Sequence, residues 1–133
     1  MAEPTRLVGA LLVRQDRLLL GRRSPWKVRC PNSWDLFGGH VEIREGWTQA
    51  LARELDEELG VTPIQAREIA RHRLDDRIEY RVFAVRAWSG GEPAIRNDEH
   101  TALGWFTREE VRRLDPLASD AYRDLLLTAL GPR

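Results

Sequence analysis

The chain has 133 residues, of which 42% are hydrophobic and 32% charged, and its 21 basic and 21 acidic side chains give a formal net charge of zero. These values suit one domain over residues 1–133 and argue against a nucleic acid polymer as partner, because such a partner favours a basic surface. No apolar run reaches the length of a membrane span, no signal peptide is visible, and Cys30 is the only cysteine, so we expect a cytoplasmic protein without an internal disulfide.

The N-terminal third of the chain predicts short strands and one surface loop. The strand candidates are apolar segments: Leu7 to Val13, Arg17 to Gly21, Trp34 to Phe37 and His40 to Ile43. Gln15-Asp16 separates the first two strands and favours a hairpin. Ser24 to Ser33 holds two prolines and is typical of a surface loop, where binding groups are often carried. Gly38-Gly39 is expected to break the chain between the last two strands.

Trp47 to Leu59 is predicted to form a helix. Its apolar residues Trp47, Leu51, Leu55 and Leu59 recur at four-residue spacing, which places them in one stripe on a helix surface. Gly60 follows directly, at the position where a left-handed residue commonly ends a helix.

The C-terminal half predicts further strands and two helices. The strand candidates are Ile64 to His72, Ile78 to Trp88 and Leu103 to Phe106, with a bend at Asp75-Asp76. Thr107 to Glu110 matches a capping box that opens a short helix, and Ser119 or Asp120 is expected to cap a last helix that runs through Leu130. This order predicts an α/β fold, with a mixed β-sheet flanked by helices.

Three acidic residues crowd together on the predicted helix between residues 47 and 59. Glu54, Glu57 and Glu58 share a helix face beside the apolar stripe, where like charges repel by roughly 0.2–0.5 kcal/mol per pair. A divalent cation removes this repulsion, and Mg²⁺ prefers hard oxygen ligands such as carboxylates. The alternative is a solvated acidic face that binds nothing.

The stretch from Gly39 to Val61, GHVEIREGWTQALARELDEELGV, fits a longer pattern. It resembles the Nudix box, G-x5-E-x7-R-E-U-x-E-E-x-G-U with U a bulky aliphatic residue, and it misses no fixed position. Softer likenesses, such as the LLLGRR and WDLFGGH segments, extend the match to most of the chain. The resemblance implies a Nudix-type α/β/α sandwich. It also implies hydrolysis of a nucleoside diphosphate linked to another moiety, with Mg²⁺ or Mn²⁺ as the cofactor.

The resemblance implies roles for the acidic residues of the box. Glu57 and Glu58 match the family's paired metal ligands. Glu54 matches a position that serves as a ligand or as the base that activates water, and these two roles stay open. All three are therefore candidate catalytic and metal-binding residues. Arg53 and Glu45 match a structural pair that ties the loop to the helix.

Two further metal ligands are implied outside the helix. The backbone carbonyl of Gly38 matches a ligand of MutT-type members, and a glycine suits a backbone ligand because close approach tolerates no side chain. Glu99 stands six residues before Trp105, which is the spacing of an additional carboxylate ligand in such members. An exposed loop acid is the alternative for Glu99, and Asp98 is the second choice as ligand.

Four residues are candidates for contacts with the substrate. Arg23 matches a phosphate-binding arginine, with an ordinary surface arginine as the alternative. Trp34 is a candidate for stacking on a base, with core packing as the alternative, and Asp35 is a candidate for the base edge, with a turn role as the alternative. Ser119 aligns with an asparagine that reads oxidised guanine in MutT-type enzymes, but its shorter side chain lacks the paired donor and acceptor of an amide, and this departure weakens the hypothesis of 8-oxo-dGTP as a substrate.

The residues after the box narrow the substrate class. ADP-ribose hydrolases tend to have a proline where this chain has Asp76, and dinucleoside polyphosphate hydrolases tend to have a tyrosine where it has Arg77. By elimination and by length, the chain resembles MutT-type nucleoside triphosphate pyrophosphohydrolases, although Phe37 replaces their usual proline before the two glycines. The alternatives are a nucleotide-sugar or other diphosphate-X hydrolase, and a nucleotide-sensing module without turnover. We expect a small-molecule nucleotide as partner and no membrane; the oligomeric state stays open, with a homodimer as one option.

Overall fold

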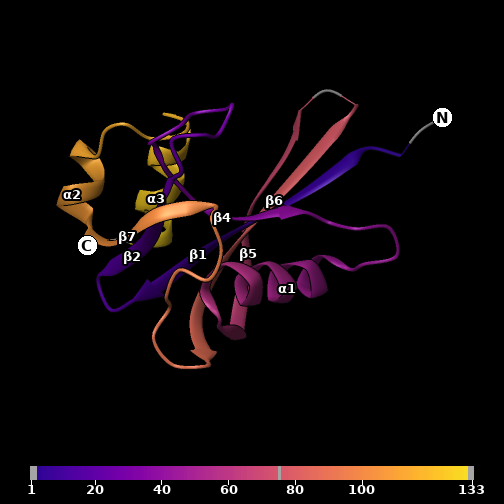
Figure 1. The fold of residues 1–133 in the computed structure, drawn as a ribbon, viewed down its shortest axis with the longest axis horizontal. Coiled ribbons are helices and arrows are strands. Elements are labelled where there is room, and N and C mark those ends of the chain that lie inside the picture. The colour runs from indigo at the N-terminus through magenta and orange to yellow at the C-terminus, as the bar shows by residue number, and fades with distance from the viewer. Residues whose placement is uncertain (1–2, 75, 132–133) are drawn as a thin grey trace.

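The computed structural model describes residues 3–74 and 76–131, and Figure 1 shows their arrangement. The elements in chain order are β1 (Thr5–Arg14), β2 (Arg17–Arg23), β3 (Trp34–Asp35), β4 (Phe37–His40), α1 (Trp47–Leu59), β5 (Thr62–Leu74), β6 (Ile78–Ser89), β7 (His100–Thr107), α2 (Arg108–Arg113) and α3 (Tyr122–Ala129). Asp75, which belongs to the predicted bend, lies outside the described residues. None of the described helices has the length and apolar character needed to cross a lipid bilayer.

The described strands form one mixed sheet of seven strands. Its main path runs β3-β2-β1-β6-β5, while β4 pairs with β1 and β7 pairs with β2. The predicted hairpin of β1 and β2 is confirmed, because these strands pair antiparallel. β1 and β6 pair parallel, with Gly9 opposite Val82, so β6 lies inside the sheet, as its nearly continuous apolar sequence suggests.

Helices cover both faces of the sheet, which gives the predicted α/β/α sandwich (Figure 1). Side chains of a strand alternate between the two faces, and β1 follows this rule. Ala10 and Leu12 pack with the buried side chains of α1, whereas Leu11 and Val13 pack with Val111 of α2 and with the buried residues of α3. Each layer of the core therefore takes every second residue of the same strand.

Helix α1 begins and ends at the predicted residues. Leu51, Leu55 and Leu59 of its apolar stripe are each at most 1% exposed, so the stripe is the face that packs on the sheet. Gly60 follows in the left-handed conformation, with φ 71°, and its N–H donates to the carbonyl of Asp56. The predicted capping box of α2 is also confirmed, because Thr107 and Glu110 exchange hydrogen bonds.

Two predictions around the paired glycines are wrong. Gly38 and Gly39 do not break the chain but form the middle of β4, and residues 41–43 form a loop instead of continuing a strand from His40. The reason is the pairing with β1, which sets Gly39 opposite Val8 and Gly38 opposite Gly9. The backbones of β1 and β4 come close together at this point, and such an approach favours glycine. Glycine is otherwise uncommon in strands.

The predicted start of the last helix is also wrong. Helix α3 begins at Tyr122, and its N-cap is Ala121, without a side-chain cap. The carbonyls of Ser119 and Asp120 accept hydrogen bonds from the N–H groups of Tyr122 and Arg123, both at 3.1 Å, so a turn precedes the helix and provides these partners. The Ser119 side chain accepts from the Ala121 N–H at 3.3 Å, and the helix ends at Ala129, one residue before the predicted end.

Candidate active site

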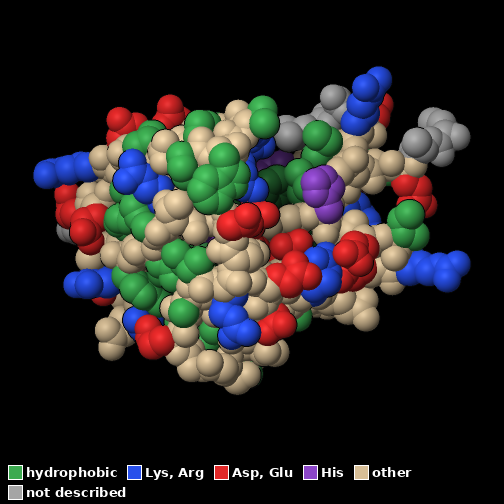
Figure 2. Space-filling model, viewed as in Figure 1, with side chains coloured by type: hydrophobic (Ala, Val, Ile, Leu, Met, Phe, Trp, Pro, Cys, Tyr) green, Lys and Arg blue, Asp and Glu red, His purple; other side chains and the backbone are tan. Residues whose placement is uncertain are grey.

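A cleft of about 490 Å³ opens where β4 meets the C-terminal part of α1. One side carries Gly38, Gly39 and Glu58, together with Glu99 from the segment before β7. Figure 2 shows this face of the molecule hollowed beside a group of acidic side chains. The cleft therefore joins residues from the Nudix-like stretch to residues that lie far from it in sequence.

Glu58 and Glu54 form the buried part of the acidic cluster. Glu58 is only 4% exposed, and its Oε2 accepts a hydrogen bond from the Gly38 N–H at 3.0 Å. Burial, together with the neighbouring charge of Glu54, raises the pKa of Glu58 to about 9. A Cβ at residue 39 would lie 2.5 Å from Oε1 of Glu54, so Gly39 leaves the room that this carboxylate occupies.

Gly38 is required by the β1 backbone. Its φ is 136°, and a Cβ at this position would lie 1.9 Å from the carbonyl oxygen of Val8. The sequence suggested that a metal ion comes close to this glycine, whereas the close approach in the structure is made by a neighbouring strand. The role of the Gly38 carbonyl as a ligand stays a prediction.

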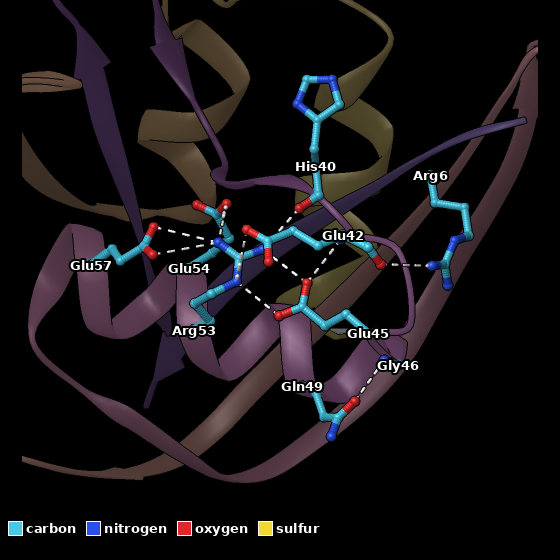
Figure 3. Close-up of polar contacts among 9 residues, drawn as sticks. All are labelled: Arg6, His40, Glu42, Glu45, Gly46, Gln49, Arg53, Glu54 and Glu57. Carbon is cyan, nitrogen blue, oxygen red and sulfur yellow. Dashed lines mark hydrogen bonds and ion pairs between the residues drawn. The ribbon is translucent and has the colours of Figure 1, made fainter.

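Arg53 is the hub of a network on the N-terminal side of the cluster, drawn in Figure 3. Its Nε and Nη2 donate to the two carboxylate oxygens of Glu45 at 2.8 and 2.9 Å, and Nη2 also donates to the His40 carbonyl at 2.9 Å. Nη1 reaches Glu54 at 3.1 Å and Glu57 at 3.5 Å. The contact expected between Arg53 and Glu45 is confirmed, and the same guanidinium balances part of the charge of the acidic cluster.

Glu99 is held in the lining of the cleft by contacts with the loop that follows β2. The backbone of residues 98 and 99 is fixed by Ser24, which is fully buried: its N–H donates to the Glu99 carbonyl at 3.1 Å, and its hydroxyl donates to the Asp98 carbonyl. The Glu99 side chain forms an ion pair with Lys27. Glu99 lines the cleft and the exposed Asp98 does not, so the geometry favours Glu99 as the candidate ligand.

His100 lies against Glu58 and was not selected from the sequence. Its Nδ1 is 3.8 Å from Oε1 of Glu58, and burial lowers its pKa to about 4. A Cβ at residue 21 would lie 2.4 Å from the imidazole, so Gly21 of β2 makes room for this ring. Only the pairing of β7 with β2 brings His100 to the cleft, and no local sequence pattern marks it.

The candidate substrate contacts divide into two groups. Arg23 and Asp35 line the cleft and bind each other, with 3.1 Å between Nη1 and Oδ2. Trp34 and Ser119 do not line it: the Trp34 ring packs edge-on against Phe106, with ring centroids 4.9 Å apart, in the core beside α3.

Three more residues line the cleft that were not among the candidate site residues of the sequence: Arg29, Tyr80 and Tyr122. Burial raises the pKa of Tyr122, and its neighbours Tyr80 and Arg29 oppose this rise. Burial raises the pKa of Tyr80. These groups come from a loop, from β6 and from α3, so only the folded chain brings them together.

The donor set of the acidic side fits a hard divalent cation. Glu54, Glu57, Glu58 and Glu99 offer carboxylate oxygens, which Mg²⁺ and Mn²⁺ prefer over nitrogen or sulfur. Within the described residues, no three acidic, histidine or cysteine side chains converge on one point, and Arg53 lies between Glu54 and Glu57. A cation at this place would share Glu54 and Glu57 with Arg53, and it would offset the burial and the charge of Glu54 that raise the pKa of Glu58.

Comparisons with known proteins show which family the chain resembles. The family model of the NUDIX domain matches residues 3–127. The CTP pyrophosphohydrolase of Escherichia coli (strain K12) is 33% identical over 114 residues, which cover 84% of this chain and 82% of that protein. A putative 8-oxo-dGTP diphosphatase 2 of Mycobacterium tuberculosis is 34% identical over 130 residues, with 86% and 81% covered. The crystal structure of a MutT NUDIX hydrolase from Burkholderia pseudomallei superimposes with a TM-score of 0.77 at 32% identity, over 97% of each chain.

Proposed function

The chain belongs to the NUDIX family, and from this membership we propose that it is a metal-dependent pyrophosphohydrolase of nucleoside triphosphates. Its relatives are named pyrophosphohydrolases and diphosphatases, so the protein is a Nudix hydrolase. In the proposed reaction, one water adds across the bond between the α and β phosphates. The products are a nucleoside monophosphate and pyrophosphate.

The observation that carries the proposal is the convergence of Glu54 and Glu58 beside Gly38 and Gly39, with Glu99 in the lining of the same cleft. Two carboxylates held together in a buried place cost free energy unless a cation joins them. Nudix hydrolases generally use divalent metal ions, and the oxygen donors here suit Mg²⁺, with Mn²⁺ as a substitute.

The residues of the chain have distinct roles in this proposal. Glu57, Glu58, Glu99 and the Gly38 carbonyl would hold the metal, and Glu54 would act either as a ligand or as the base that takes a proton from the attacking water. A bound divalent ion neutralises the phosphate oxygens and lowers the pKa of water. Arg53 binds Glu45 through one nitrogen of its guanidinium and Glu54 through another. In the proposal it is a positioning residue that orients the Glu54 carboxylate and does not contact the substrate.

The nucleoside end of the substrate would lie in the part of the cleft that is lined by Arg29, Tyr80 and Tyr122, whose side chains carry hydrogen-bond donors. Ser119, the residue expected to read an oxidised base, does not line the cleft. The base preference is therefore a question for a substrate panel, which should include CTP, dGTP, 8-oxo-dGTP and a nucleotide sugar.

Hydrolysis of this panel with Mg²⁺ or Mn²⁺, scored for released phosphate and pyrophosphate, tests the proposal. We expect pyrophosphate and a nucleoside monophosphate from at least one triphosphate. Glu57→Gln should lower kcat by more than about 100-fold, because even residues that only orient metal ligands contribute 10–100-fold. Asp56→Asn is the matched control, since Asp56 lies on the same helix and is exposed. Turnover of the nucleotide sugar alone would replace the proposed substrate class, and wild-type turnover in Glu57→Gln would refute the site.

A further inference from the structure

A second cavity, of about 600 Å³, adjoins the cleft on the side of the loop between β4 and α1. It is lined by the start of β1 and by this loop, including Glu3, Arg6, Ile43 and Arg44. Thr5 and His40 line both the cleft and this second cavity, so the two are neighbours. The chain connects them directly, because His40 follows Gly39, which lies over the Glu54 carboxylate.

Arg44 occupies a strained position at the edge of the second cavity. Its φ is 71°, in the left-handed region that suits glycine and costs free energy for an arginine. The turn is enforced by its neighbours: the Glu42 N–H donates to Oε1 of Glu45 at 2.9 Å, and the Glu45 N–H donates to the Glu42 carbonyl at 3.0 Å. Arg53 locks Glu45 in place, so the network in Figure 3 holds the turn that carries Arg44.

The Arg44 side chain is exposed, and its guanidinium has no hydrogen-bond or ion-pair partner within residues 3–74 and 76–131. The cations of the cleft differ in this respect. Arg23 is bound to Asp35 and to the Arg29 carbonyl, and Arg29 lies near Tyr122 and Asp35. Lys27, which is not part of the lining, is paired with Glu99. A triphosphate bound at the acidic cluster would therefore find an unpaired guanidinium, that of Arg44, on the side of the second cavity.

We propose that the second cavity is the subsite for the terminal phosphates of the substrate, which leave as pyrophosphate, and that Arg44 is their main ligand. This inference rests on the proposed hydrolysis of nucleoside triphosphates. A guanidinium donates two parallel hydrogen bonds to a phosphate, which a strained but fixed turn can present in one direction. Arg6 adds positive charge from β1, where its guanidinium donates to the Glu42 carbonyl at 3.0 Å and lies over the Trp47 ring.

Titration with inorganic pyrophosphate, followed by calorimetry in EDTA and again with Mg²⁺, tests the subsite without turnover. Arg44→Gln should weaken pyrophosphate binding about tenfold in both conditions, as expected for one charge-assisted contact. It should also reduce the preference in kcat/KM for a triphosphate over the matching diphosphate. Arg67→Gln is the control, because Arg67 is exposed on β5 and lines neither cavity.

Unchanged pyrophosphate affinity in Arg44→Gln, or an equal loss in Arg67→Gln, would overturn the subsite, as would a wild-type protein that does not bind pyrophosphate. If the wild type hydrolyses triphosphates in that case, the proposed function still stands. Loss of pyrophosphate binding in Arg44→Gln, together with no hydrolysis by the wild type, would keep the subsite and refute the function. Arg44→Gly gives a second measure: relief of the left-handed strain should raise Tm while pyrophosphate binding is lost.

Discussion

Arg53 binds both carboxylate oxygens of Glu45, with Nε to Oε2 at 2.8 Å and Nη2 to Oε1 at 2.9 Å. The pair joins helix α1 to the loop that follows β4, and the same guanidinium reaches Glu54 and Glu57. One side chain thus fixes the loop, supports the turn at Arg44 and partly neutralises the acidic cluster. Replacement of Arg53 should therefore lower both the free energy of unfolding and kcat.

Acid should weaken this pair within a defined pH window. The hydrogen bonds from Arg53 lower the pKa of Glu45 from 4.5 to about 2. Because the folded pKa is the lower one, the stabilisation is complete above the unfolded pKa and is lost as the pH falls from about 4.5 to about 2. We expect urea unfolding at several pH values to show a steeper loss of unfolding free energy in the wild type than in Glu45→Gln across this window. Equal slopes would show that the pair does not stabilise the fold.

Arg53→Lys should lower the free energy of unfolding by about 1–2 kcal/mol, because an ammonium cannot reproduce the two parallel hydrogen bonds. Arg71 offers a matched control. It binds both oxygens of Glu68 at 2.9 and 3.0 Å, but its side chain is 57% exposed, against 26% for Arg53. Arg71→Lys should therefore change the free energy of unfolding much less than Arg53→Lys in the same urea experiment. Similar losses in both variants would contradict the special position of Arg53.

Gly38→Ala should destabilise the protein by about 3 kcal/mol or more, because the new Cβ would lie 1.9 Å from the Val8 carbonyl oxygen. Gly91→Ala is the control that measures the cost of a positive φ without a steric clash. Gly91 also has a positive φ, of 89°, but nothing lies within 4 Å of a Cβ placed there, so we expect a loss of about 1 kcal/mol. Thermal or urea unfolding of both variants measures the difference. The account of β4 fails if Gly38→Ala is no worse than Gly91→Ala.

Glu58→Gln should separate stability from metal binding. Burial and the charge of Glu54 disfavour the ionised form of Glu58 and raise its pKa, and a neutral amide avoids this cost while an oxygen remains for the Gly38 N–H. We expect the variant in EDTA at neutral pH to unfold with a free energy equal to or above that of the wild type. Its metal affinity should fall more than about tenfold. A clear loss of stability in EDTA would mean that Glu58 serves the fold itself.

The sequence predicted those elements whose apolar residues recur at a regular spacing. Helix α1 was predicted to the residue, because Leu51, Leu55 and Leu59 keep the helical period and Gly60 ends it. The error at Gly38 and Gly39 arose because glycine usually interrupts strands, whereas here β1 comes so close that only glycine fits. The error at Ser119 arose from a turn whose backbone carbonyls, and not a side chain, meet the first N–H groups of α3.

The part of the candidate site that lies on one helix was also predictable, whereas the part that depends on strand pairing was not. Glu54 and Glu58 lie one helical turn apart, so their proximity follows from local sequence. His100 and Tyr80 reach the cleft only through strand pairing, His100 beside Arg23 of β2 and Tyr80 beside Leu7 of β1. Such contacts depend on the topology of the sheet, which no periodicity within one segment reveals.

The most direct test of the account is whether the acidic cluster takes up a divalent cation. Calorimetric titration of Mn²⁺ into the protein, with a triphosphate whose α–β bridging oxygen is replaced by methylene, measures this without hydrolysis. We expect saturable binding in the wild type and in Asp56→Asn, and a loss of more than about tenfold in Glu57→Gln and Glu58→Gln. Mn²⁺ binding that is equally strong in all four proteins would contradict the assignment of Glu57 and Glu58 as the metal site.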